Sequence, residues 1–149
     1  MENKFTAGKI KELESCCRAN GVPLTVQRRV VLETLAGRKD HPTADQVYDE
    51  VKGIIKGVSR TTVYRVLETF VRLGLAKRVS SPHGKGRFDA DTGSHHHLIC
   101  LECEKVIDFP DERPQFHQST LPDLPDFEIK GYSLAITGYC ELCRDIINH

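Results

Sequence analysis

The fold is decided by residues 59–73, which read SRTTVYRVLETFVRL. Ser59 can cap a helix that begins at Arg60, and Gly74 can end it. Apolar side chains recur within this stretch at helical spacing: Val63, Val66, Leu67, Phe70 and Leu73. The spacing predicts an amphipathic helix over about 60–73 whose apolar stripe packs on neighbouring helices.

The opposite face of this predicted helix is polar and carries Thr61, Tyr64, Arg65, Glu68 and Arg72. A core has no need of a phenol beside a guanidinium. Both groups can reach base edges in the major groove of DNA, and arginine can bind guanine through two hydrogen bonds. Most polar helix faces are simply solvated, so this face indicates DNA binding only together with its neighbours in the sequence.

The flanking segments supply that context. Three more helices are predicted upstream: about 4–18, ended by Asn20-Gly21; about 25–35, closed by Gly37; and one from the capping box Thr43–Gln46 to about Val51. Downstream, residues 76–80 and 87–89 predict a two-stranded hairpin with basic residues at its tip. Helices followed by a basic hairpin form a winged helix, in which the last helix enters the groove and the wing contacts phosphates.

The net charge of zero conceals a division along the chain. Residues 1–87 hold 17 Lys and Arg against 9 Asp and Glu, a balance of +8, whereas residues 88–149 hold 4 against 12, a balance of −8. A basic half followed by an acidic half indicates one part that faces a polyanion and another that attracts cations or other partners. Solvated charge without a partner is the alternative.

The charge changes sign where the sequence is rich in Gly, Pro, Ser and Asp, a composition that breaks helices and supports turns. We therefore predict an α+β protein with a winged-helix DNA-binding domain at 1–87, a hinge at 88–94 and an α/β domain at 95–149. In the last domain the sequence predicts these elements: strands at about 97–100 and 105–109, a short helix at 112–121, and one long strand or two over 127–137.

Two identical Cys-x-x-Cys pairs lie in the acidic half, with 36 residues between them: Cys100/Cys103 and Cys140/Cys143. The two-residue gap lets both sulfurs of a pair reach one Zn²⁺ at roughly 2.3 Å, so the four thiolates can close a tetrahedral shell. The second pair is expected in a C-terminal turn. Such a zinc would attach the tail to the first hairpin and stabilise a unit too small for a large core. Cys16 and Cys17 are expected to be packing or surface thiols.

A run of three histidines, His95 to His97, precedes the first cysteine pair. On an extended segment His95 and His97 share one face and His96 points the other way. Oxygen donors near them in sequence are Asp89, Asp91 and Asp108, and His41 precedes the third predicted helix. Histidine and carboxylate ligands suit Fe²⁺ or Mn²⁺, and also Zn²⁺ or Ni²⁺. Taken singly, each of these residues is as readily a solvated carboxylate or a turn histidine.

The sequence has no run of about 18 apolar residues, so we expect no membrane span. The N-terminus has no apolar segment of the signal-peptide type, and we expect a cytoplasmic protein with reduced thiols.

With these motifs in place, the chain resembles the ferric uptake regulator superfamily from about residue 8 to residue 145. The resemblance rests on six segments: Leu24–Arg28, His41–Asp45, Ser59–Arg65, Arg87–Asp89, His95–Cys100 and Cys140–Cys143. It implies homodimeric, metal-activated repressors with an N-terminal winged helix and a C-terminal α/β dimerisation domain. A dimer with two such recognition helices would match a palindromic double-stranded DNA operator. The candidate DNA contacts lie in the second and fourth predicted helices: Gln27, Arg28, Arg60, Thr61, Tyr64 and Arg65.

Within the superfamily, the peroxide-response repressors are the subfamily that the chain resembles most. The positions that match their regulatory site all carry that subfamily's residue types: His41, Asp89, His95, His97 and Asp108. Asp108 stands where iron-uptake repressors more often carry Glu. Iron-uptake repressors tend to have an additional metal site, and the residues at its matching positions here are a poor set of donors: His96, Gln115 and Tyr132. Whether His96 and His117 form a further metal site stays open. No spare cysteine matches the sensing ligand of zinc-uptake repressors.

Other positions depart from the subfamily or the family. Tyr64-Arg65 is more similar to the recognition helix of iron-uptake repressors. Val26 replaces the usual Pro, and Glu104 replaces the usual Gly. The alternatives to a peroxide-sensing repressor are therefore an iron-responsive repressor and, from another class, a zinc-containing thiol oxidoreductase or hydrolase. The basic half would have no role in such an enzyme, so we expect no enzymatic activity.

Overall fold

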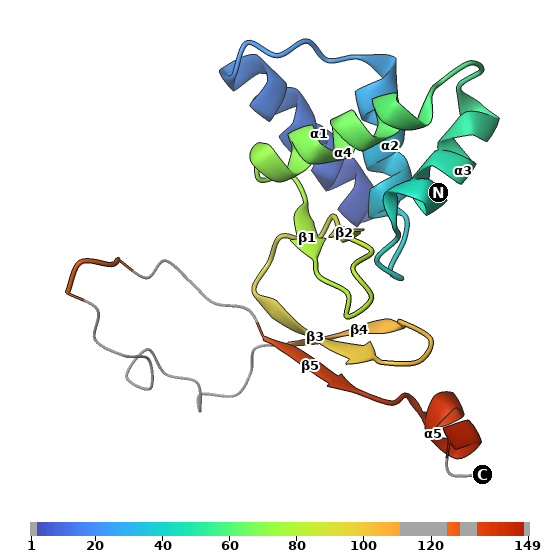
Figure 1. Ribbon diagram of the computed structural model, residues 1–149. Coiled ribbons are helices and arrows are strands. Elements are labelled where there is room, and N and C mark those ends of the chain that lie inside the picture. The colour runs from blue at the N-terminus through green and yellow to red at the C-terminus, as the bar shows by residue number, and fades with distance from the viewer. Residues whose placement is uncertain (1–2, 111–124, 129–133, 148–149) are drawn as a thin grey trace. The chain divides into compact units, whose positions relative to one another are not determined.

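The computed structural model describes residues 3–110, 125–128 and 134–147, which form two compact units, Met1–Thr92 and Gly93–His149 (Figure 1). The elements of unit 1 are α1 (Lys4–Ala19), α2 (Val26–Ala36), α3 (Ala44–Ile54), α4 (Arg60–Arg72), β1 (Lys77–Val79) and β2 (Arg87–Asp89). The elements of unit 2 are β3 (His95–Cys100), β4 (Val106–Pro110), β5 (Ala135–Gly138) and α5 (Glu141–Ile147). The fold is mixed α+β, as predicted.

Unit 1 is built around α2, which contacts α1, α3, α4 and β2. Its core includes the largest side chains that are fully buried: Leu13, Leu32, Leu35, Leu67 and Phe70. The predicted apolar stripe of α4 faces this core, although Leu73 is only partly buried. Burial of each such side chain contributes about 1.5–3 kcal/mol, so the packing of α4 on α2 fixes which face of α4 remains exposed.

The helix boundaries in unit 1 follow the capping residues that the sequence predicts. Thr43 and Gln46 form the reciprocal capping box at the start of α3, and the Ser59 hydroxyl accepts a hydrogen bond from the Thr62 amide at the start of α4. Gly74 has a φ of +72°, the left-handed conformation that suits glycine after a helix. The helix α3 continues to Ile54, three residues beyond the predicted end, because the Ile55 amide still donates to the Val51 carbonyl.

The wing is the two-stranded antiparallel sheet of β1 and β2, with Arg78 opposite Phe88. Phe88 is buried against the helical core, and the Phe88 amide donates to the Pro42 carbonyl at 2.9 Å. Thr43 forms an isolated bridge with Arg87. The second strand of the wing is therefore hydrogen-bonded to the segment that leads into α3.

Unit 2 contains a three-stranded sheet in the order β4-β3-β5. The central strand β3 pairs antiparallel with β4 and parallel with β5. It begins at His95, two residues before the predicted start, because His95 and His96 pair with the end of β4. The two faces of β3 carry different residues: His95, His97 and Ile99 on one face, and His96, Leu98 and Cys100 on the other.

The sequence predicted that the C-terminal cysteine pair lies in a turn, and this prediction is wrong. Cys140 directly precedes α5 and Cys143 lies in its first turn, because the Arg144 amide donates to the Cys140 carbonyl at 2.8 Å and the chain continues as a helix. Within the strand predicted over 127–137, the residues that the structure describes are 127–128 and 134–137, and of these 135–137 belong to β5, which ends at Gly138. The helix predicted at 112–121 lies outside the described residues. No helix in the described part of the chain has the length and apolar character needed to cross a bilayer.

Candidate metal centres and nucleic-acid interface

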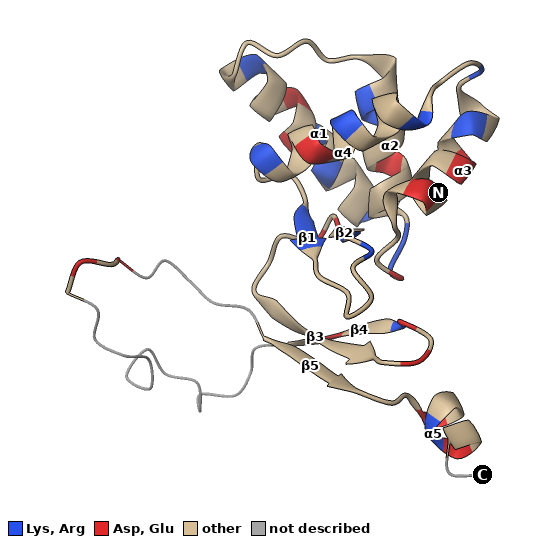
Figure 2. Ribbon diagram, viewed as in Figure 1, with Lys and Arg blue, Asp and Glu red and all other residues tan. Residues whose placement is uncertain are grey.

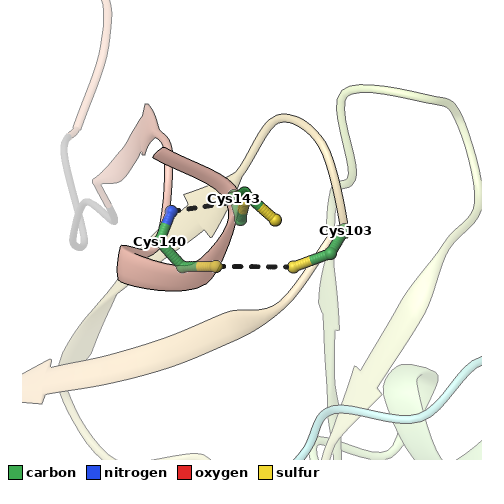
Figure 3. A group of neighbouring side chains, drawn as sticks. Cys103, Cys140 and Cys143 are labelled. Carbon is green, nitrogen blue, oxygen red and sulfur yellow. Dashed lines mark hydrogen bonds between the residues drawn. The ribbon is translucent and has the colours of Figure 1, made fainter. Parts of the chain in front are cut away.

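The four cysteines of the two pairs come together in unit 2, where their sulfur atoms all lie within 4.8 Å of one another. Figure 3 shows Cys103 and Cys140 facing each other, and their Sγ atoms are 3.7 Å apart. Cys100 ends β3, and Cys143 belongs to α5. The cluster therefore joins the turn after the central strand to the C-terminal helix, two segments about 40 residues apart in the sequence.

The spacing of these sulfurs suits a tetrahedral ion. Zn²⁺ binds thiolates at about 2.3 Å, which places tetrahedral ligands about 3.8 Å from one another. The 3.7 Å between Cys103 and Cys140 matches that edge. Four sulfur donors with no oxygen among them also favour Zn²⁺ over the harder ions Mn²⁺ or Mg²⁺.

The pKa values of Cys100 and Cys143 are shifted in opposite directions. The backbone amides of Cys140 and Cys103 lower the pKa of Cys100 to about 6 by hydrogen bonding to its sulfur. By contrast, hydrogen bonding to Cys140 and burial raise the pKa of Cys143 to about 12. The raised pKa keeps the proton on Cys143 at neutral pH, and a bound cation would favour its thiolate form.

The turn that carries Cys103 holds an unusual backbone. Glu104 has a φ of +59°, a conformation that glycine adopts at lower cost, and its amide donates to the Cys100 carbonyl at 3.1 Å. The strain of a non-glycine residue in this region is about 1–3 kcal/mol and must be offset by the surrounding contacts.

A second group of donors lies in unit 1. His41 and Asp89 are both buried, and the Nε2 atom of His41 is 3.2 Å from a carboxylate oxygen of Asp89. The other oxygen of Asp89 accepts the Asp91 amide at 2.8 Å. This hydrogen bond holds the carboxylate with one oxygen directed at the imidazole. Asp91 thus contributes through its backbone amide.

A third group lies on one face of the sheet in unit 2. His97 on β3 stands opposite Asp108 on β4, and His95 precedes it by one full pleat. The Nε2 atoms of His95 and His97 lie 3.5 and 3.3 Å from the same Asp108 oxygen. The Nδ1 atom of His95 lies 2.9 Å from the Gly93 carbonyl. Because a carbonyl only accepts hydrogen bonds, that contact favours the tautomer with the proton on Nδ1, and Nε2 is then the nitrogen that could bind a metal.

His96 lies on the other face of β3, as alternation predicts. Its Nδ1 atom accepts the Leu134 amide at 3.1 Å, and its ring packs on Phe109 at 5.2 Å between centroids. It therefore serves the packing of the sheet. Gln115, Tyr132 and His117, which were considered with it for an additional site, lie outside the described residues.

The pair in unit 1 and the trio in unit 2 contain nitrogen and oxygen donors only. Such donors suit Fe²⁺ and Mn²⁺, and the buried carboxylate of Asp89 would be compensated by a divalent cation. The donor sets therefore fit the class of metal that the sequence predicts, and they differ from the thiolate cluster in the ion that they favour.

The candidate DNA-binding residues on α4 are exposed: Thr61, Tyr64 and Arg65. Gln27 is also exposed at the start of α2. Arg60 forms an ion pair with Asp45, and its guanidinium lies over the Tyr48 ring, 5.0 Å from the centroid. The Arg28 guanidinium donates to the Pro23 carbonyl, and its amide donates to the hydroxyl of Thr25, the N-cap of α2, so both contacts stabilise the helix start.

One contact of the wing was not predicted from the sequence. Arg78 on β1 forms an ion pair with Glu68 on α4, and its guanidinium lies over Phe88 at 5.8 Å from the ring centroid. It joins the wing to the polar face of α4. Figure 2 shows the Lys and Arg positions of unit 1 in blue along its helices and on β1.

The remaining cysteines pack as expected, since Cys17 is buried in the core and Cys16 is partly buried beside it.

Residues 19–137 match the profile of the Ferric uptake regulator family. The chain belongs to this family. It is 31% identical over 139 residues to the peroxide-responsive repressor PerR of Staphylococcus aureus, covering 92% of this chain and 93% of that one.

Solved structures with the same fold include the ferric uptake regulator of Helicobacter pylori, with a TM-score of 0.79, 19% identity and 97% of each chain covered. A second structure is the ferric uptake regulator of Pseudomonas aeruginosa with manganese. Its TM-score is 0.69 at 29% identity, and the match covers 86% of this chain and 97% of that one. The protein is thus a metal-dependent regulator of this family, whose named relatives are transcription regulators.

The thiolate cluster gives a first testable prediction. Cys100→Ser should remove bound zinc and lower the melting temperature of the protein, because unit 2 has a small apolar core and loses the link between β3 and α5. Zinc content by elemental analysis and melting by circular dichroism measure both effects. Cys16→Ser, which lies outside the cluster, is the matched control and should keep its zinc. An unchanged melting curve for Cys100→Ser would mean that the thiolates have no structural role.

Proposed function

We propose that this protein is a homodimeric DNA-binding repressor with one structural Zn²⁺ per chain and a regulatory Fe²⁺ or Mn²⁺ site, and that it senses peroxide by metal-catalysed oxidation of a ligand histidine. The structural zinc is assigned to Cys100, Cys103, Cys140 and Cys143. The regulatory ion is assigned to His41, Asp89, His95, His97 and Asp108. The observation that carries the proposal is this second donor set, which contains only His and Asp. The 31% identity of the chain to a peroxide-responsive repressor supports it.

The regulatory ion is proposed to join the two units. His41 and Asp89 belong to unit 1, whereas His95, His97 and Asp108 belong to unit 2. Neither set alone offers about four donors, the smallest number in most closed metal sites. An ion shared by both sets would favour one relative orientation of the DNA-binding and C-terminal domains, by an amount equal to its differential affinity for the two arrangements.

DNA recognition is assigned to the exposed face of α4, with Gln27, Arg28 and Arg60 at the neighbouring helix starts. Two copies of the chain would place two such helices about one turn of DNA apart, roughly 34 Å or a multiple of it, and so match a palindromic operator. Domains 1–87 and 95–149 with a hinge at 88–94 are the parts that the ion would align. Release of the ion would relax that alignment and weaken operator binding.

Homodimerisation through unit 2 is supported by an apolar row across its sheet. Leu98 stands in register with Ile107 on β4 and Ile136 on β5, and the three side chains are 38%, 42% and 49% exposed. Exposed apolar side chains in a contiguous row commonly mark an interface, because their burial against a second copy removes them from water. The row lies on the sheet face opposite His95 and His97, so a partner there would leave those ligands accessible.

The peroxide chemistry follows from the ligand types. Bound Fe²⁺ would catalyse the redox reaction between H₂O₂ and a ligand histidine, whose ring gives up the two electrons that reduce the peroxide. Bound Mn²⁺ would support DNA binding without that reactivity. One oxygen atom of H₂O₂ is transferred to the carbon between the two ring nitrogens of His41 or His95, and the other leaves as water. The oxidised ring loses its donor nitrogen, so the affinity for the ion falls and DNA is released.

An iron-responsive repressor is the alternative, because the pair Tyr64-Arg65 is shared with the recognition helix of iron-uptake repressors. It differs in that peroxide would leave the ligands unmodified while loss of iron releases DNA. An enzymatic role as a thiol oxidoreductase is disfavoured, since both cysteine pairs belong to a single cluster rather than to a separate reactive pair. A cytoplasmic location is proposed with the DNA-binding role.

The contribution of α4 is testable by substitution. Arg65→Ala should weaken binding to the specific operator by about 1–3 kcal/mol, because one arginine that binds a base through two hydrogen bonds contributes about that much discrimination. Fluorescence anisotropy with a specific and a scrambled duplex at fixed salt measures it. Arg18→Ala, an exposed arginine on α1, is the control. Equal losses for both variants on both duplexes would indicate only general charge attraction.

The regulatory role of the trio is tested separately from folding. His97→Ala should abolish Mn²⁺-dependent DNA binding and leave one zinc per chain with a nearly unchanged melting temperature. His96→Asn is the matched control, because it alters the neighbouring residue on the other face of β3 while keeping an acceptor for the Leu134 amide. Retained Mn²⁺ dependence in His97→Ala would remove this residue from the site.

Peroxide sensing has a direct chemical readout. The Fe²⁺-loaded protein treated with H₂O₂ should lose DNA binding and gain the mass of one oxygen atom, about 16 Da, on a peptide that contains His41 or His95. The Mn²⁺-loaded protein, treated in the same way, should show neither change. DNA release from an unmodified Fe²⁺ protein would favour the iron-responsive alternative.

A further inference from the structure

The segment that holds His41 is unusual in its backbone and in what fixes it. His41 has a φ of +52°, a left-handed conformation that costs a non-glycine residue about 1–3 kcal/mol. The following residue is Pro42, which disfavours the helical region for His41 and so limits its alternatives. The imidazole of His41 nevertheless contacts Asp89, which lies on β2. Something in the fold must hold the strained residue in place.

Strand β2 provides those contacts, and most of them come from Arg87. The Nη1 atom of Arg87 donates to the His41 carbonyl at 3.0 Å in a buried position. The backbone of Arg87 forms the bridge to Thr43, and the next residue, Phe88, donates its amide to the Pro42 carbonyl at 2.9 Å. Three successive residues, His41 to Thr43, are thus bound to two successive residues of β2.

Arg87 and Asp89 lie on the same side of β2, because they are two residues apart on an extended strand. One contacts the backbone of His41 through its guanidinium, and the other contacts the ring of His41 at 3.2 Å. Phe88, between them, points into the core and is 2% exposed. The buried phenyl ring therefore fixes the rotation of the strand, and with it the directions of Arg87 and Asp89.

We propose that Arg87 is a positioning residue for the regulatory metal site: it does not bind the ion, but it holds His41 in the strained backbone conformation in which its Nε2 atom meets Asp89. This inference rests on the proposed function, because it assigns a task toward the regulatory ion. Outer contacts of this kind typically change metal affinity by 10–100-fold when they are removed.

An opposing effect must be weighed, since a guanidinium near a cation site also repels the cation. Asp40 lies near this charge: the Arg38 hydrogen bond lowers the pKa of Asp40, and the charge of Arg87 lowers it further. The positive charge of Arg87 is therefore partly balanced within unit 1. The two effects change the metal affinity in opposite directions when Arg87 is replaced. Loss of positioning weakens metal binding, whereas loss of repulsion strengthens it.

The test is a titration of the zinc-loaded, full-length protein with Mn²⁺, in which free Mn²⁺ is followed by electron paramagnetic resonance. Arg87→Met keeps the length of the side chain and removes its donors and charge, and it should raise the dissociation constant for Mn²⁺ at least 10-fold. Arg78→Met, on the paired strand of the wing, is the matched control and should bind Mn²⁺ like the wild type. Saturating Mn²⁺ should restore wild-type operator affinity to Arg87→Met, a result that a general loss of structure would not give.

An affinity of Arg87→Met within twofold of the wild type, or a tighter one, overturns the proposal. Should Arg87→Met lack a cooperative melting transition, Arg87→Lys decides the question, since it keeps the charge but its ammonium group ends short of the position of Nη1. A Lys variant with normal melting and Mn²⁺ binding weakened at least threefold supports positioning, and one with wild-type affinity contradicts it. A wild-type protein that binds no Mn²⁺ beyond its zinc would instead refute the proposed function itself.

Discussion

Four sulfur atoms within 4.8 Å of one another impose the constraint on which unit 2 depends. Thiolates at that separation repel one another. Backbone hydrogen bonds nevertheless lower the pKa of Cys100, whereas hydrogen bonding to Cys140 and burial raise the pKa of Cys143. Only a cation of suitable size and preference for sulfur allows all four to ionise together. Because the described apolar core of this unit is small, the same cluster that demands the ion also fastens the C-terminal helix to the central strand.

The sheet of unit 2 separates three tasks by strand geometry alone. Alternation along β3 puts His95 and His97 on one face, and Leu98 on the other in register with Ile107 and Ile136. Cys100 ends the same strand and belongs to the thiolate cluster. A candidate regulatory ligand, an exposed apolar side chain and a candidate structural ligand are thereby carried within six residues, without competing for the same space. The choice of nitrogen and oxygen donors at one place and sulfur at the other keeps the two kinds of metal apart.

Backbone strain is found beside both candidate metal centres. Among the described residues, positive φ outside glycine occurs at His41 and Glu104, next to or within these donor groups. Such conformations persist only where surrounding contacts hold them, and here the contacts are identifiable: Arg87 and Phe88 for the segment that begins at His41, and the Cys100 carbonyl for Glu104. The strain is local, and it places donor atoms where a regular strand or helix would not.

The sequence by itself determined the α+β class, the four helices of unit 1, the wing, and the identity of the thiolate cluster. These features follow from short-range rules: capping at Thr43 and Ser59, the apolar period of α4, and the fixed reach of a Cys-x-x-Cys pair. The alternation of side chains along a strand likewise predicted that His96 lies on the opposite face of β3 from His95 and His97. Tertiary structure decided the rest, because it depends on contacts between distant segments. Three contacts join residues whose proximity no local pattern encodes: the Arg60–Asp45 ion pair, the Arg78–Glu68 ion pair, and the hydrogen bond from Arg87 to the His41 carbonyl.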